Sequence, residues 1–104
     1  MEFEVLVPRR RSGRESLVME AAFKVAESLG ARLVVERGSV RETSVYVKKG
    51  RGRFMVYEDL DKNLSQSEVR IHIIHSIISS YVHGHVHQTC TITMEGGEIV
   101  AGRS

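Results

Sequence analysis

Hydrophobic residues are most concentrated in the stretch from residue 65 to residue 82, SQSEVRIHIIHSIISSYV, which contains five isoleucines. The stretch is too long for an ordinary strand, and it opens with Ser65 and Glu68 in the arrangement of a capping box. With successive residues placed roughly 100° apart, its apolar side chains gather on one broad arc. We therefore predict a helix over residues 65–82, although isoleucine favours strands. The apolar arc comprises Val69, Ile71, Ile73, Ile74, Ile77, Ile78, Tyr81 and Val82.

The opposite arc of this helix contains serine and histidine but no Lys, Asp or Glu. A fully solvated helix face usually carries charge. One interpretation is therefore that a second subunit or a ligand covers this face, and the other is that a short polar face meets water. Under the first interpretation, the candidate oligomer interface consists of His72, His75, Ser76 and Ser79.

The N-terminal part of the chain alternates between apolar and polar positions. Phe3, Val5 and Val7 share one side of a predicted strand that Pro8 ends. A helix is then predicted to begin near Gly13. Gly30 stands where a C-terminal helix cap belongs.

Short strands are predicted from Leu33 to Glu36, from Thr43 to Val47 and from Phe54 to Tyr57, the last two forming a hairpin across KKGRGR. A long strand from Val86 to Met94 and a short edge strand from Glu98 to Ala101 are expected after the second helix. The predicted order is β-α-β-β-β-α-β, with an optional last strand. It indicates a single-domain α+β fold over residues 1–104: a two-layer sandwich with a mostly antiparallel sheet and both helices on one face.

Basic residues are concentrated in two predicted loops, although the net charge is only +2. The rest of the chain holds seven basic residues against thirteen acidic ones, a formal charge of −6. Two basic loops on an acidic body favour an anionic partner. The first loop contains Arg9, Arg10, Arg11 and Arg14, and the second contains Lys48, Lys49, Arg51 and Arg53. The predicted topology puts these loops at opposite ends of the sheet.

Nucleic acid, and RNA rather than duplex DNA, is the partner that these loops favour. Arginine and lysine neutralise phosphates, and the N-terminus of the first helix could hold one through its free N–H groups. Tyr46 and Tyr57 are expected on the free face of the sheet, where aromatic rings can stack on bases. Basic residues at a hairpin tip also serve solubility, which is the simpler interpretation of the second loop taken alone.

Two other functions compete with RNA binding. The first is an oligomeric scaffold or protein-interaction module, with the chain as a homodimer or higher oligomer. The second is a small histidine-dependent or metal-binding enzyme that uses His83, His85 and His87, which would share one face of the last long strand. No HExxH motif or cysteine pair accompanies these histidines, and Cys90 is expected in the core. We therefore predict no catalytic residue, metal or cofactor.

The remaining composition bears on the environment of the protein. The N-terminus lacks a signal-peptide pattern, and no stretch approaches the length of a membrane span, so a cytoplasmic protein without a membrane partner is expected. Eleven arginines against four lysines, with few Asn, Gln and Cys residues, indicate a thermophile.

Overall fold

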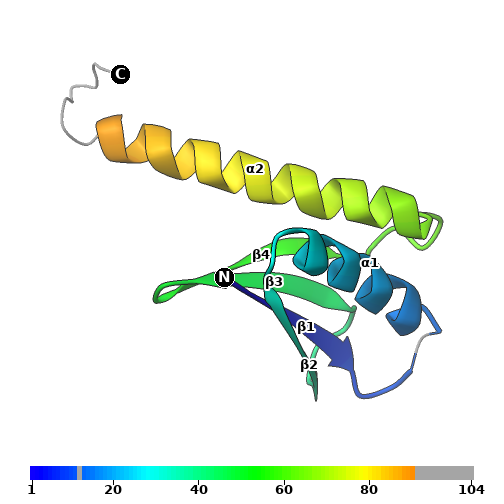
Figure 1. The fold of residues 1–104 in the computed structure, drawn as a ribbon. Helices are drawn as coiled ribbons and strands as arrows, with labels where there is room; N and C mark the ends of the chain where they lie inside the picture. The colour runs from blue at the N-terminus through cyan, green and yellow to red at the C-terminus, as the bar shows by residue number, and fades with distance from the viewer. Residues whose placement is uncertain (12, 91–104) are drawn as a thin grey trace.

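The computed structural model of the protein describes the backbone at residues 1–11 and 13–90, and the side chains of these residues up to residue 80. The elements in chain order are β1 (Glu2–Pro8), α1 (Glu15–Ser28), β2 (Arg32–Gly38), β3 (Ser44–Lys49), β4 (Gly52–Glu58) and α2 (Gln66–Cys90). The sheet has the order β2-β1-β3-β4, in which β1 and β2 are parallel and the other neighbours are antiparallel. Both helices lie over one face of the sheet (Figure 1). The predicted α+β fold is confirmed.

The core lies between the sheet and the inner faces of the two helices. On β1, Phe3, Val5 and Val7 are buried, as the alternation of apolar residues predicts. The part of α1 that faces the sheet carries small residues, including Ala22 and Ala26, which allow the helix to approach closely. Among the described side chains of α2, Val69 and Ile73 are fully buried and Ile77 packs partly against the core, whereas other members of the predicted apolar arc are exposed.

Local signals define the ends of both helices. At the end of α1, Gly30 has a φ of +67°, and the N–H of Ala31 donates to the carbonyl of Ala26 over 2.8 Å, which is a Schellman motif. At the start of α2, the Ser65 N–H donates to Glu68 Oε1 over 2.9 Å, and the Glu68 N–H donates to Ser65 Oγ over 3.3 Å. The first of these bonds lowers the pKa of Glu68. The predicted Gly30 cap and the predicted capping box are therefore confirmed.

A β-bulge in the hairpin overturns one predicted side-chain orientation. The pairing of β3 with β4 shifts register between Val45 and Tyr46, so Val45 pairs with Tyr57 whereas Tyr46 pairs with Met55. The extra residue on β4 breaks the simple alternation. Val56 and Tyr57 are consequently both buried, and the prediction that Tyr57 lies on the free face of the sheet is wrong.

The prediction of a long strand from Val86 to Met94 is wrong for residues 86–90, because α2 continues to Cys90. Gly84 does not end the helix, since one glycine inside a helix costs only about 1 kcal/mol. His83, His85 and His87 are therefore part of a helix and do not share one face of a strand. The side chains of these histidines, residues 91–94 and the strand predicted from Glu98 to Ala101 lie outside the described part of the chain.

Candidate functional site

The two basic loops lie at opposite ends of the sheet, as the topology predicts (Figure 1). Residues 9–11 follow the end of β1, whereas the hairpin tip around Gly50 lies at the other end because β3 runs antiparallel to β1. The two loops are therefore separate candidate sites, and their surroundings differ.

An open hollow of about 480 Å³ lies where β1 and β2 end. Pro8 and Gly38, the last residues of these parallel strands, form part of its wall. Ligands commonly bind at the carboxyl ends of parallel strands. Five cationic side chains and one carboxylate line this hollow, which gives it a formal charge of +4. We call it the arginine hollow; its charged residues are Arg9, Arg10, Arg11, Arg41, Glu42 and Lys62.

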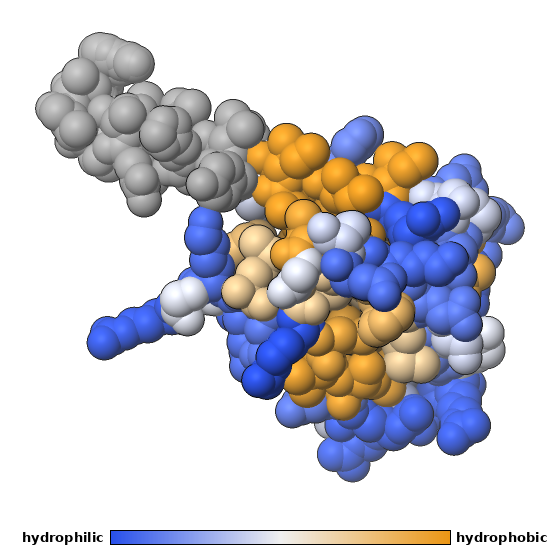
Figure 2. Space-filling model, in the orientation of Figure 1, coloured by the Kyte–Doolittle hydropathy of each residue, from blue (hydrophilic) through white to orange (hydrophobic). Residues whose placement is uncertain are grey.

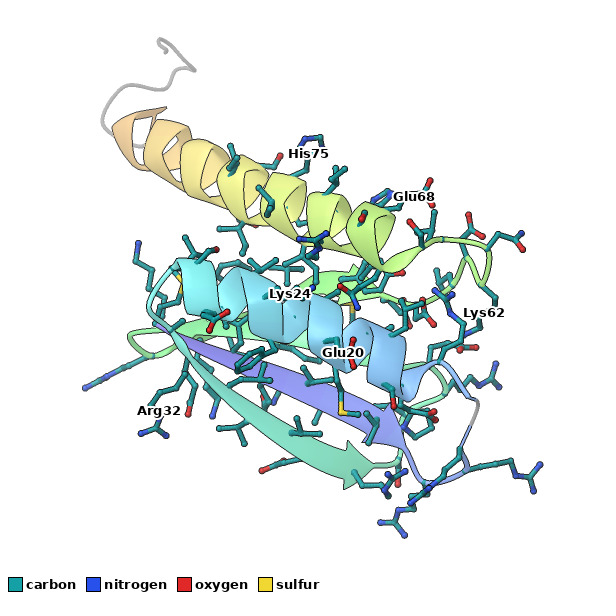
Figure 3. All side chains as sticks on the ribbon, turned by 45° about the vertical axis from the view of Figure 1, so that its right-hand side comes forward. Glu20, Lys24, Arg32, Lys62, Glu68 and His75 are labelled. Carbon is teal, nitrogen blue, oxygen red and sulfur yellow. The ribbon has the colours of Figure 1, made fainter. Side chains whose placement is uncertain are left out.

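Two of these charged groups neutralise each other. Lys62 forms an ion pair with Glu42, and its ammonium also donates to the carbonyl of Asp59 over 2.6 Å. Burial alone would lower the pKa of Lys62, but the hydrogen bonds and negative charges of Glu42 and Asp59 outweigh it and raise that pKa. Figure 3 places Lys62 on the loop that precedes α2. The uncompensated charge of the hollow therefore belongs to its arginines.

The four arginines of the hollow have no ion-pair partner among the described residues. Arg9, Arg10 and Arg11 follow β1, whereas Arg41 follows β2, and all four are exposed. Arg37 stabilises the rim, because its guanidinium donates to the carbonyl of Pro8 over 2.6 Å and so joins the ends of β2 and β1. Four guanidinium groups around one hollow form a surface that attracts anions.

Sequence reasoning identified Arg9, Arg10 and Arg11 but missed Arg41. The missing signal was the parallel pairing of β1 with β2, which sets Pro8 opposite Gly38. Residues that follow these two strands must then lie close together. A parallel pairing of the first two strands, combined with the basic residues that follow each of them, would have identified Arg41.

Arg14 has a different role from the neighbouring arginines. Its Nε and Nη2 atoms donate to the two carboxylate oxygens of Asp59 over 2.9 and 2.7 Å. Its Nη1 atom donates to the carbonyls of Lys62 and Leu64 over 3.0 and 2.9 Å. Arg14 therefore connects the start of α1 to the loop before α2, and we remove it from the predicted phosphate contacts.

Asp59 is the centre of this connection. Its side chain is only 1% exposed, and it also accepts a hydrogen bond of 2.8 Å from the hydroxyl of Tyr57. Burial alone would raise the pKa of Asp59, but the bonds from Arg14 and Tyr57, with the charges of Arg14 and Lys62, outweigh it and lower that pKa. The pKa of Tyr57 is raised by burial and by the bond to Asp59. Tyr57 is thus a structural residue rather than a stacking platform.

A carboxylate of the chain itself lies in the first turn of α1. Glu15 is buried in the first turn, and its Oε1 atom accepts a hydrogen bond of 3.0 Å from the N–H of Gly13. A negative charge at this position complements the helix dipole, as a bound phosphate would. The structure therefore favours the arginine hollow over the helix N-terminus as the position of an anion.

The hairpin site is partly neutralised by the acidic residues of β1. Arg53 lies 3.3 Å from Glu4 and 4.1 Å from the centre of the Tyr46 ring, which it covers. Lys48 lies 3.8 Å from Glu2. At least two of the four predicted cations, Lys48 and Arg53, are therefore ion-paired, and the ring of Tyr46 is already covered on one side.

The predicted oligomer interface and the metal hypothesis both rest on histidines. His72 contacts the ring of Tyr57, with centroids 6.3 Å apart, and His75 points away from α1 (Figure 3). Ser76 is half-buried, whereas Ser79 is exposed. Within the described side chains, no group of three or more His, Cys, Asp or Glu residues could hold a metal ion.

The chain matches no protein-family model, and no similar protein was found among curated proteins or solved structures. No helix in residues 1–11 and 13–90 has the length and hydrophobicity needed to cross a membrane.

Proposed function

We propose that this protein binds RNA through the arginine hollow, by contacts with phosphates and without catalysis. The observation that carries the proposal is the set of four arginines around one hollow, none of them ion-paired within the described chain. Guanidinium groups bind phosphate through paired hydrogen bonds, and each phosphate contact releases counterions.

The arrangement of the arginines favours a chain of phosphates over a single small anion. Arg9, Arg10 and Arg11 are consecutive and exposed, so an extended chain of phosphates can contact several of them at once. Arg41 adds a fourth charge from the segment after β2, and the hollow is open to solvent, which makes it accessible to a strand. Guanidinium planes also stack on the unpaired bases of single-stranded RNA.

The hairpin supplies a second and weaker contact. Arg51 is exposed, but Lys48 and Arg53 are paired with Glu2 and Glu4. A phosphate must displace the carboxylate of Glu2 or Glu4 before the phosphate can contact Lys48 or Arg53 fully. We therefore expect the hairpin to add affinity only for RNA long enough to extend from one end of the sheet to the other.

Fluorescence anisotropy of a labelled single-stranded RNA, measured at several salt concentrations, tests the proposal. The triple variant R9A/R10A/R11A should lose about tenfold or more in affinity at low salt. If each arginine neutralises one phosphate, the slope of log affinity against log salt should fall by about 2, since each contact on a single strand contributes about 0.7.

The double variant K49A/R51A is the matched control, because it removes positive charge from the other end of the sheet. Its affinity for a short RNA should fall much less than that of the triple variant. An absence of binding by the wild-type chain at low salt would refute the proposal. Equal losses in the two variants would show a general charge effect instead of a site at the hollow.

A further inference from the structure

Three isoleucines on the outer side of α2 are exposed. The exposed fractions are 52% for Ile71, 41% for Ile74 and 55% for Ile78. Figure 2 shows hydrophobic residues over the described part of this helix. The sequence predicts that these residues share one buried arc with Val69 and Ile73, and the structure divides that arc into a covered side and an uncovered side.

The three residues form a continuous stripe. Their spacing of three and then four residues is that of the a and d positions of a coiled coil, so they align along one side of the helix. The buried side of α2, with Val69 and Ile73, lies on a different part of its circumference. Apolar residues on two sides of a helix indicate that both sides are packed against other surfaces.

We propose that the isoleucine stripe of α2, defined by Ile71, Ile74 and Ile78, packs against the same stripe of a second copy of this chain. The two α2 helices lie side by side about a twofold axis, which brings the same surface of each chain into the interface. This assembly goes beyond RNA binding and does not depend on it.

The charge pattern identifies the occupant. Residues 71–90 contain no Lys, Arg, Asp or Glu. A partner surface with fixed charges would bury them against α2 without a counter-charge, which is costly. The stripe therefore fits an apolar helix face without charges, and residues 71–90 of α2 in a second copy provide one.

The other helix of the chain does not provide such a face. Three residues on the outer side of α1 are both charged and exposed: Glu20, Lys24 and Glu27. Figure 3 shows two of them, Glu20 and Lys24, on α1. Of the two described helices, α2 alone is therefore complementary to α2.

The length and position of α2 permit the pairing. Its 25 residues correspond to about 37 Å of helix, or roughly three and a half heptads. The helix runs on beyond the body formed by α1 and the sheet (Figure 1), so a second α2 can lie along it. The arginine hollow lies at the ends of β1 and β2, at the opposite end of the body from this part of the helix (Figure 1).

The residues predicted from sequence as the oligomer interface do not form the stripe, and one of them, His72, lies near the ring of Tyr57 instead. His75 and Ser79 are exposed at its edge, whereas Ser76 is half-buried on the side toward the body. Polar residues at the edge of an apolar contact are typical of an interface rim.

Sedimentation equilibrium of the full chain at about 5–100 μM tests the pairing. The wild type should show a mass of about twice 11.7 kDa at the higher concentrations. The variant I74K/I78K should be a monomer over the whole range, because lysine keeps the helix propensity but places charge in the stripe. Circular dichroism should show the same helix content in both.

The variant F23K is the matched control. Phe23 is 51% exposed on α1, so its replacement removes a similar exposed hydrophobic side chain outside the stripe. F23K should remain a dimer. A monomeric wild type at 100 μM, or an I74K/I78K variant that still dimerises, would overturn the proposal. The more conservative I74S/I78S variant should also weaken the dimer at least tenfold, which separates loss of apolar contact from charge repulsion.

Discussion

Replacing Asp59 by asparagine should destabilise the fold more than any surface substitution. The change preserves the shape of the side chain but removes the negative charge that Arg14 and Lys62 surround. Removing one partner of a buried ion pair costs about 3–5 kcal/mol. Asp59 is 1% exposed, but the side chain of Arg14 is 16% exposed and can recover some solvation, so the lower value, about 3 kcal/mol, applies.

Calorimetry and urea denaturation at pH 7 would measure this loss. For a domain of this size, about 3 kcal/mol corresponds to a fall of roughly 12–24 °C in Tm. The single variants D59N and R14M and the double variant form a thermodynamic cycle. The double variant should be much less destabilised than the sum of the two single changes, because no charge is then left without its partner.

The pH dependence provides an independent check of the same reasoning. The pKa of Asp59 is lowered in the folded state, so its charge contributes full stability above the ordinary aspartate value of about 3.9 and loses it as the pH falls through the folded value. The difference in unfolding free energy between the wild type and D59N should be constant from pH 7 to pH 5. It should shrink below about pH 4. A difference that is already lost at pH 6, or one below about 1 kcal/mol at pH 7, would refute the assignment of a buried ion pair at the start of α1.

Two further substitutions test single contacts. Y57F removes the hydroxyl that donates to Asp59 and should cost about 1–2 kcal/mol in urea denaturation, and a neutral result would mean that Asp59 does not need this donor. G30A places a side chain at a φ of +67° and should lower the free energy of unfolding by about 1–2 kcal/mol. The control G38A, at a position with equal space and no positive φ, should lower it less. Equal effects of the two changes would contradict the proposed helix cap.

The parts of the fold that sequence predicted correctly depend on local rules. Alternation identified the buried side of β1, and the spacing of Ser65 and Glu68 identified the start of α2. Each signal involves residues only a few positions apart, whose geometry the backbone fixes. The error at Val86–Met94 also has a physical reason. An alternating pattern that follows a glycine is compatible with a strand, but a helix that has already formed can continue through a single glycine at a small cost in free energy.

The candidate site could not be read from local patterns, because its composition depends on pairings between distant residues. Arg14 and Asp59 are 45 residues apart, and only the fold shows that they form an ion pair. The register shift beside Val45 changed the side on which Tyr57 lies. In both cases the sequence contained the right residue types, but the partner that decides their role lies on another element.

The two basic loops illustrate the consequence for function. Each has four cations, and the sequence favours the first loop only because solubility is a simpler explanation for basic residues at a hairpin tip. In the fold, the hairpin lies beside β1, whose Glu2 and Glu4 pair with Lys48 and Arg53. The first loop loses only Arg14 to an internal ion pair, and the parallel pairing of β1 with β2 replaces it with Arg41. The folded chain therefore has one strongly positive end, and under the proposed function RNA should bind there, at the carboxyl ends of β1 and β2.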